Sequence, residues 1–188
     1  MAIKTFTTGE VLTASDTNTY LANSGLVYIT EVALSTTAID GIFTSTYDNY
    51  RIVVNNAQSA SSNALIRFQL RDTANATLNS ADYQAATTRF DSAGTTFNYG
   101  TAATTSGETG INLITTVDSP SFAMDVFGPR LTDPTSVVVA GMGAITGPSI
   151  VATACTFRLT TACAGIIFSL SAGTIASGRV FVYGYRKA

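Results

Sequence analysis

The sequence contains no histidine and no tryptophan, and only 12% of its residues are charged. The missing histidine removes the commonest general base, so Ser-His-Asp and Cys-His triads are excluded, as are most metal-hydrolase sites. Carboxylates remain, but no pair has a spacing that indicates the two facing carboxyl groups of a glycosidase. Calcium-loop and phosphate-loop motifs are also missing. We therefore predict that the protein is not an enzyme and that it has no catalytic residues, no bound metal and no cofactor.

Positive charge is scarce, because Lys4 and Lys187 are the only lysines and the arginines are scattered singly along the chain. The net charge is −2, whereas nucleic-acid binding needs a basic stripe that neutralises phosphates. No apolar run approaches the roughly 18 residues of a membrane-spanning helix. Lys4 is followed by polar residues instead of the apolar core of a signal peptide. We predict neither nucleic-acid binding nor membrane insertion.

Cysteine is limited to Cys155 and Cys163. Two thiols without a histidine cannot complete a structural zinc site. If both lie in a hairpin that turns near Thr161, the strand partner of Cys155 falls beyond Gly165, so Cys163 is out of register for a disulfide. The sequence therefore predicts two buried free thiols in a protein that folds in a reducing cytoplasm.

The first 25 residues differ in pattern from the rest and are interpreted as an N-terminal anchoring arm. Residues 13–16 have the form of a capping box, with Thr13 as the N-cap and Asp16 three residues later. A short helix over residues 14–22 is expected to follow, and Gly25 is placed to end it. Because so short a helix is unstable alone in water, it must dock on its own domain or on another subunit. The side chains predicted to anchor the arm are Phe6, Val11, Leu12, Tyr20 and Leu21.

From residue 26 onward the hydrophobic period changes to two, as in β-strands. In residues 64–71, Ile66, Phe68 and Leu70 alternate with outward-facing neighbours, which predicts a strand with one buried face. Further strands are predicted at residues 26–34, 47–54, 111–117, 122–126, 135–142, 157–159, 166–170 and 179–186. Their regular spacing, with Gly and Pro turn signals between them, predicts an all-β domain over residues 26–188, an antiparallel β-sandwich or jelly roll.

Residues 72–110 are the exception, since they form a long polar stretch with few aliphatic side chains. Ala93 and Gly94 could turn a hairpin between residues 87–90 and 95–99. A loop this long in a compact domain is usually functional or packed against a partner. The candidate receptor or partner contacts in this stretch are the aromatic side chains Tyr83, Phe90, Phe97 and Tyr99.

The N-terminal residues 6–23 read FTTGEVLTASDTNTYLAN. This segment resembles the F-x-x-G-E-V-L-T-A-x-x-x-N-x-Y-L opening of structural proteins of tailed bacteriophages, often proteins of tails or fibres. Residues 43–54 and 178–186 also resemble the start and end of a β-sandwich module in such virion proteins, while the middle of the chain matches nothing. The resemblance implies a location in the virion, assembly in the cytoplasm of the bacterial host, and no catalytic residues.

Two classes of function are expected. The first is a virion structural subunit, a homotrimer whose arm anchors it to other virion proteins of the capsid or tail, with the sandwich displayed outward. Low charge and many small or apolar side chains favour such a subunit. The brevity of the chain favours capsid decoration (a cement protein), and the usual context of the opening motif favours a tail fibre or tail tip. The second class is a module that recognises a host surface glycan through residues 72–110.

Overall fold

The computed structural model describes residues 8–11, 13, 25–35, 37–60, 63–113, 120–144 and 147–186. Within these residues every regular element is a β-strand, and all paired strands are antiparallel. The large sheet has eight strands in the order β1 (Leu26–Ala33), β11 (Ile175–Tyr185), β2 (Asn49–Ser59), β7 (Phe122–Phe127), β8 (Thr135–Ala144), β9 (Pro148–Phe157), β4 (Tyr83–Asp91) and β5 (Thr96–Thr104). The small sheet has three strands in the order β10 (Cys163–Leu170), β3 (Ala64–Asp72) and β6 (Gly107–Leu113).

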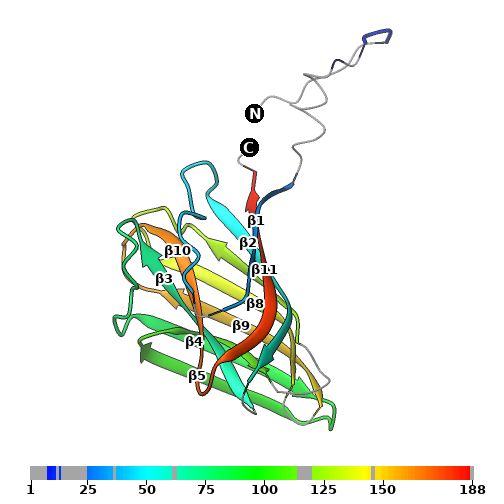
Figure 1. Ribbon diagram of the computed structural model, residues 1–188, viewed down its shortest axis with the longest axis vertical. Helices are drawn as coiled ribbons and strands as arrows, with labels where there is room; N and C mark the ends of the chain where they lie inside the picture. The colour runs from blue at the N-terminus through cyan, green and yellow to red at the C-terminus, as the bar shows by residue number, and fades with distance from the viewer. Residues whose placement is uncertain are drawn as a thin grey trace.

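The two sheets share one apolar core, which gives a sandwich-like arrangement; in Figure 1, β3 and β10 lie in front of β8 and β9. In β3, Ile66, Phe68 and Leu70 are fully buried, while the residues between them are partly exposed. The alternation predicted for this strand is therefore confirmed, as is the all-β antiparallel class. A jelly-roll connectivity, which arranges eight strands in two Greek keys, is not confirmed.

The segment that follows β1 extends the small sheet at its β10 edge. Its apolar side chains Leu34, Ile39, Ile42 and Phe43 are buried. Ile39 and Ile166 exchange backbone hydrogen bonds of 2.8 and 3.1 Å, so the segment runs beside β10 as a short additional ladder. This extension covers core side chains that the three strands of the small sheet alone would leave open.

Strand β6 makes a close contact with the large sheet at Gly110. Gly110 has a φ of +75°, and a Cβ atom at this position would lie 2.6 Å from Thr153 Oγ1 and 2.7 Å from Thr87 Cγ2. The hydroxyls of these two buried threonines are 2.8 Å apart, and Thr153 also donates a hydrogen bond of 2.9 Å to the carbonyl of Thr109. Only glycine fits both the backbone conformation and the space here.

The prediction that residues 72–110 form a long loop is wrong, because most of them lie in β4, β5 and the start of β6. The predicted hairpin is present between β4 and β5. The Asp91 side chain accepts hydrogen bonds from the backbone N–H groups of Ala93 and Thr95, and Gly94 has a φ of +79°. The sequence of these strands is rich in threonine and alanine, which give little hydrophobic contrast between the two faces of a strand. It therefore shows no clear alternation from which the strands could be predicted.

The strand predicted at residues 157–159 is also misplaced, since β9 ends at Phe157 and Leu159 lies in the turn beyond it. The hairpin considered for the two cysteines does not form. Cys155 lies in β9 of the large sheet and Cys163 in β10 of the small sheet, and both are buried free thiols. The chain therefore crosses from one sheet to the other between the cysteines.

The first strand begins at Leu26, the residue at which the sequence places the start of the β domain. The helix predicted over residues 14–22 lies outside the described residues. The strand predicted at residues 111–117 corresponds to β6, which begins earlier, at Gly107. Residues 114–117 of that prediction also lie outside the described residues.

We expect Gly110→Ala to lower the free energy of unfolding by about 2–4 kcal/mol, because it combines a strained left-handed φ with overpacking against Thr87 and Thr153. The matched control is Gly94→Ala. Gly94 also has a positive φ, but no atom lies within 4 Å of a Cβ atom added at this position. We therefore expect this variant to lose only about 1 kcal/mol of unfolding free energy. Urea unfolding of the two variants measures the difference. Equal losses of unfolding free energy in the two variants would show that β6 is not closely packed against the large sheet at Gly110.

Candidate interaction site

The predicted anchoring residues Phe6, Leu12, Tyr20 and Leu21 lie outside the described residues. Val11 is described, and 79% of its surface is exposed. The anchoring role of the arm therefore stays a prediction.

Of the four aromatic side chains predicted to contact a receptor or partner, Tyr83 belongs to the core instead. Its ring is fully buried, and it packs against Phe68 and Phe157 at centroid distances of 6.1 and 4.7 Å. Its hydroxyl accepts a hydrogen bond from the Leu70 N–H and donates one to the Leu78 carbonyl, each 2.9 Å long. Both its apolar and its polar surface are thus used inside the fold.

The other three aromatic side chains are exposed but do not lie on the same face of the large sheet. Phe97 and Tyr99 pair across β4–β5 with Arg89 and Thr87, and directly opposite residues share a face. Thr87 is buried toward the core. Phe97 and Tyr99 therefore point to the side of the small sheet, and Phe90 points to the opposite, outer side.

Phe97, Tyr99 and Arg89 form a small surface that we call the β5 ledge. Phe97 is 41% and Tyr99 37% exposed, so the small sheet does not cover this edge of the large sheet completely. The Arg89 guanidinium carbon lies 4.5 Å from the centroid of the Phe97 ring, a cation–π contact. Partial burial raises the pKa of Tyr99, and Thr87, Glu108 and Arg89 lie close enough to modulate it.

The outer face of the large sheet carries a second and larger surface. Strand register places its side chains in three rows across β8, β9 and β4. We call these nine residues the outer patch: Val138, Ala154 and Ala86 in one row, Ala140, Ala152 and Thr88 in the next, and Met142, Ile150 and Phe90 in the third. None is charged, and eight are apolar. This surface is an uncharged apolar patch on exposed β-strands.

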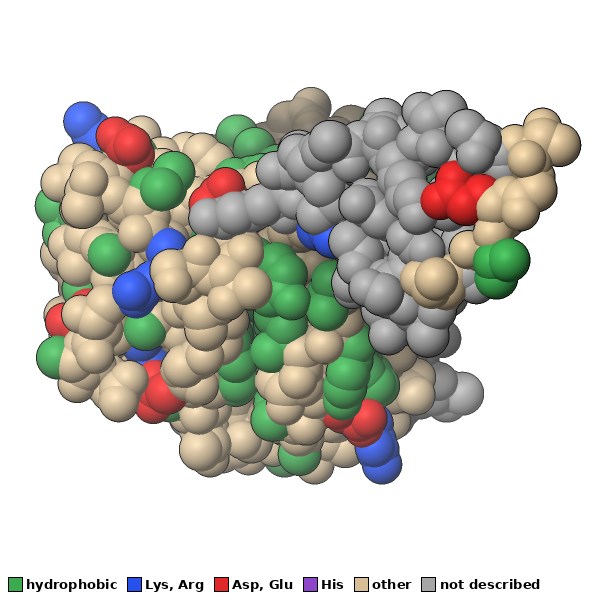
Figure 2. Space-filling model, turned by 90° about the horizontal axis from the view of Figure 1, so that it is seen from above, with side chains coloured by type: hydrophobic (Ala, Val, Ile, Leu, Met, Phe, Trp, Pro, Cys, Tyr) green, Lys and Arg blue, Asp and Glu red, His purple; other side chains and the backbone are tan. Residues whose placement is uncertain are grey.

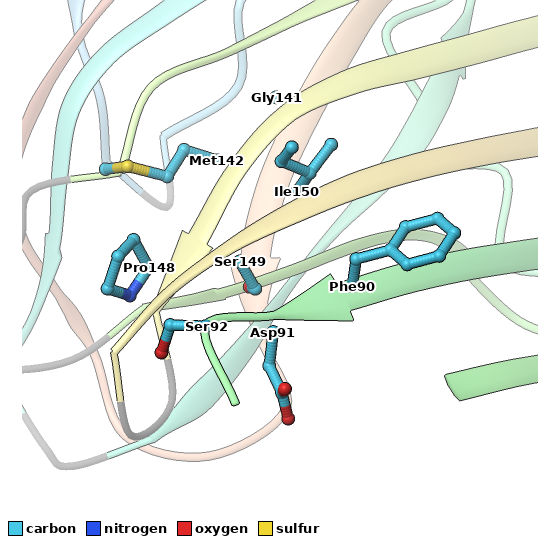
Figure 3. Close-up of a pocket in the computed structure, with 8 residues that line it drawn as sticks. All are labelled: Phe90, Asp91, Ser92, Gly141, Met142, Pro148, Ser149 and Ile150. Atoms are coloured by element: carbon cyan, nitrogen blue, oxygen red, sulfur yellow. The ribbon is translucent and has the colours of Figure 1, made fainter. Parts of the chain in front are cut away.

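A shallow hollow of about 510 Å³ lies at one end of the outer patch (Figure 3). Met142, Ile150 and Phe90 reach it from three neighbouring strands, and Pro148 and Ser92 complete its rim. Its one ionisable lining residue is Asp91, whose carboxylate already accepts two backbone N–H groups in the β4–β5 turn. The hollow is lined mainly by apolar side chains, and its polar groups are the Asp91 carboxylate and the hydroxyls of Ser92 and Ser149.

A second open hollow of about 480 Å³ lies over β4 and β5 on this outer face, beside Gly100. The Thr88 hydroxyl donates a 2.8 Å hydrogen bond to the Asn98 side-chain carbonyl there. The outer patch therefore has a polar margin on its β5 side.

Four pairs of opposite charge lie on the described part of the chain. Arg67 pairs with Glu108 at 3.2 Å, Arg71 with Asp40 at 2.6 Å, and Arg51 with Asp125 at 3.6 Å, and Arg179 contacts Glu31. On the face drawn in Figure 2, red and blue side chains are scattered singly or beside each other, and they form no extended area of one sign. Among the described residues, no three His, Cys, Asp or Glu side chains lie together as metal ligands. The same part of the chain holds no helix that is long and apolar enough to cross a membrane.

The two thiols are poorly suited to nucleophilic chemistry. Burial raises the pKa of Cys155 to about 12 and the pKa of Cys163 to about 11, from an ordinary value of 9.0. Both thiols therefore stay protonated at neutral pH, whereas the thiolate is the reactive form. Burial also raises the pKa of Tyr83 above its ordinary value of 10.0.

We expect the protein to lose stability above pH 9. The unfolded thiols release protons near pH 9, and the folded thiols hold them to about pH 11–12, so rising pH favours the unfolded chain. Each group contributes a slope of up to about 1.4 kcal/mol per pH unit in this window. Denaturant unfolding between pH 7 and 11 measures the loss. The double variant Cys155→Ala, Cys163→Ala should show a shallower decline, and an unchanged slope would contradict the assignment.

No protein-family model, no curated protein and no solved structure matches this chain.

Proposed function

We propose that this chain is a non-enzymatic structural subunit of a tailed-bacteriophage virion, assembled as a homotrimer. The observation that carries the proposal is the outer patch, an uncharged apolar surface on three adjacent strands of the large sheet. Contiguous exposed apolar surface of this kind is typical of protein–protein contacts. Four ion pairs among the described residues leave this surface free of charge, because none of their eight side chains belongs to the outer patch.

The resemblance of residues 6–23 to the opening of phage structural proteins supports the same proposal. In this role the N-terminal arm anchors the subunit to other virion proteins, and the β domain faces outward. A tail-fibre or tail-tip subunit and a capsid decoration protein share this design. Assembly takes place in the cytoplasm of the bacterial host, in agreement with two thiols that lie in different sheets and do not pair.

Deletion of residues 1–24 tests the anchor. The truncated chain keeps every described strand, since β1 begins at Leu26. We expect it to fold with an unchanged circular dichroism spectrum and to be missing from particles assembled in cells. Cryo-electron microscopy of particles that carry the full-length chain would show its density on the head or on the tail. Normal occupancy by the truncated chain would contradict the anchoring role, and absence of the full-length chain from purified particles would overturn the virion assignment.

A second candidate function, recognition of a host surface glycan, rests on the β5 ledge. Phe97 and Tyr99 are exposed side by side on one face of the edge strand, and Tyr99 combines an aromatic face with a hydroxyl. Exposed aromatic side chains near polar groups are suited to the apolar faces and hydroxyls of a sugar. The exposure of the β5 ledge is the observation that favours this second candidate.

We expect, on this second candidate, that Tyr99→Ala weakens binding to a glycan found by array screening by at least about tenfold, or 1.4 kcal/mol. Isothermal titration calorimetry measures the change. Tyr28→Ala is the matched control, because Tyr28 is 57% exposed but lies on β1, at the opposite edge of the large sheet. A full-length protein that binds no glycan, or an equal loss in both variants, would reject the ledge as a sugar site.

A further inference from the structure

Strands β8 and β9 carry apolar side chains on both faces, a pattern typical of strands that are covered on both sides. The β9 side chains that face the core are Ser149, Val151, Thr153, Cys155 and Phe157. The β9 side chains that face away from it are Pro148, Ile150, Ala152, Ala154 and Thr156. The outward face is thus at least as apolar as the buried face. Such a face is expected to be covered in the functional protein.

The single chain leaves this outward face in solvent. Ile150 is 71% exposed, Phe90 51% and Val138 46%. Scattered exposed hydrophobic residues are ordinary, but Ile150 and Phe90 are direct neighbours across β9–β4. The small alanines between these bulky side chains make the centre of the patch flat and accessible to another protein surface.

We infer that the outer patch is a contact surface between copies of this chain, and that a second copy covers it. The inference rests on the proposed homo-oligomeric function and assigns a surface to it. The side chains that β8, β9, β4 and β5 present on this face include no Asp, Glu, Lys or Arg. Two copies therefore meet here without like-charge repulsion and without desolvating a charge.

The size of this uncharged face agrees with a subunit contact. Four strands spaced about 4.8 Å apart and about 30 Å long span roughly 600 Å² of sheet. Each partner in a standard protein interface buries about 800 Å². The apolar centre with a margin of Thr88 and Asn98 also follows the usual arrangement of an apolar interface core within a polar rim.

A trimer closes through a heterologous contact, in which the patch of one copy meets a different surface of the next copy. The exposed edge of β5 fits this second role. Strand β5 contains no charged residue and no proline, and all nine of its residues are at least partly exposed. Charges, prolines and β-bulges are the usual protection of an edge strand against pairing. The register irregularity of β5 lies at its end, between Thr101 and Thr104. Residues 96–101 therefore form an unprotected edge beside the patch, which indicates that this edge too is covered.

Other occupants fit the patch less well. A membrane surface would require basic or Trp and Tyr side chains around the apolar area, and the patch has no such rim. A glycan would require several hydrogen-bonding groups, whereas eight of the nine patch residues are apolar. Binding of the full-length protein to phosphatidylcholine–phosphatidylglycerol vesicles that is lost on the substitution Ile150→Glu would make the patch a membrane-binding surface and would overturn the inference.

The test uses the full-length protein and the substitution Ile150→Glu. Because Ile150 is already 71% exposed, a glutamate at this position is compatible with the folded single chain. In the assembly it would place a charge in an apolar contact, so we expect the dissociation constant of the oligomer to rise at least about 100-fold. Sedimentation velocity across a concentration series measures the change, and circular dichroism checks that the fold is kept. Ala152→Glu, in the neighbouring row, provides a second variant.

Leu159→Glu is the matched control. Leu159 is similar in size to Ile150 and is 36% exposed. It lies beyond the other end of β9 and outside the patch. We expect its oligomer to stay intact. Dissociation of the control to the same extent, or an intact oligomer in both patch variants, overturns the assigned surface while the homo-oligomer stands. A monomeric wild-type protein at micromolar concentration overturns the homotrimer itself and the inference with it.

Discussion

The structure depends on the contact that β6 makes with β4 and β9. At Gly110 the backbone of β6 comes so close to Thr87 and Thr153 that no side chain fits between them. The hydroxyl network that links Thr87, Thr153 and the Thr109 carbonyl satisfies polar groups that would otherwise be buried without partners. This contact fixes where the three-stranded sheet lies on the eight-stranded sheet.

The position of the small sheet determines which surfaces remain open. Three strands and the segment beside β10 cannot cover both faces of eight strands. Among the described residues, no second sheet covers the outer face of the large sheet, and its β5 edge is half-covered. The outer patch and the β5 ledge both arise from this inequality. A two-sheet fold with equal sheets would cover more of its own apolar surface, whereas this fold leaves β8 and β9 with an apolar face for another molecule.

The sequence predicts those parts of the fold in which one face of a strand contrasts with the other. Ile66, Phe68 and Leu70 in β3 stand between outward-facing residues, so their burial follows from a period of two. In β9 both faces carry small or apolar side chains, so no period of two is visible and the sequence alone does not predict this strand. In β4 and β5, threonine and alanine give equally little contrast between the two faces, so the sequence predicts a polar loop instead.

The same limit applies to the candidate site. Three of the four aromatic side chains selected from the sequence, Phe90, Phe97 and Tyr99, are exposed, and their contact role stays a prediction. The burial of Tyr83 depends on how the two sheets pack, and no local sequence pattern shows that. The sequence does contain a signal for the outer patch, because apolar residues stand at both odd and even positions along β8 and β9, and these positions face opposite sides of the sheet. That signal is ambiguous until the register shows which residues share a face.

Hydroxyl-radical footprinting of the full-length protein, in its assembled and its dissociated forms, tests the central claim most directly. The account predicts that Phe90, Met142 and Ile150 are labelled in the dissociated chain and protected in the assembly. Met124, which is fully buried in the core, should stay unlabelled in both forms. Leu159 should react equally in both. Equal labelling of the three patch residues before and after assembly would contradict the claim that a second copy covers the outer face of the large sheet.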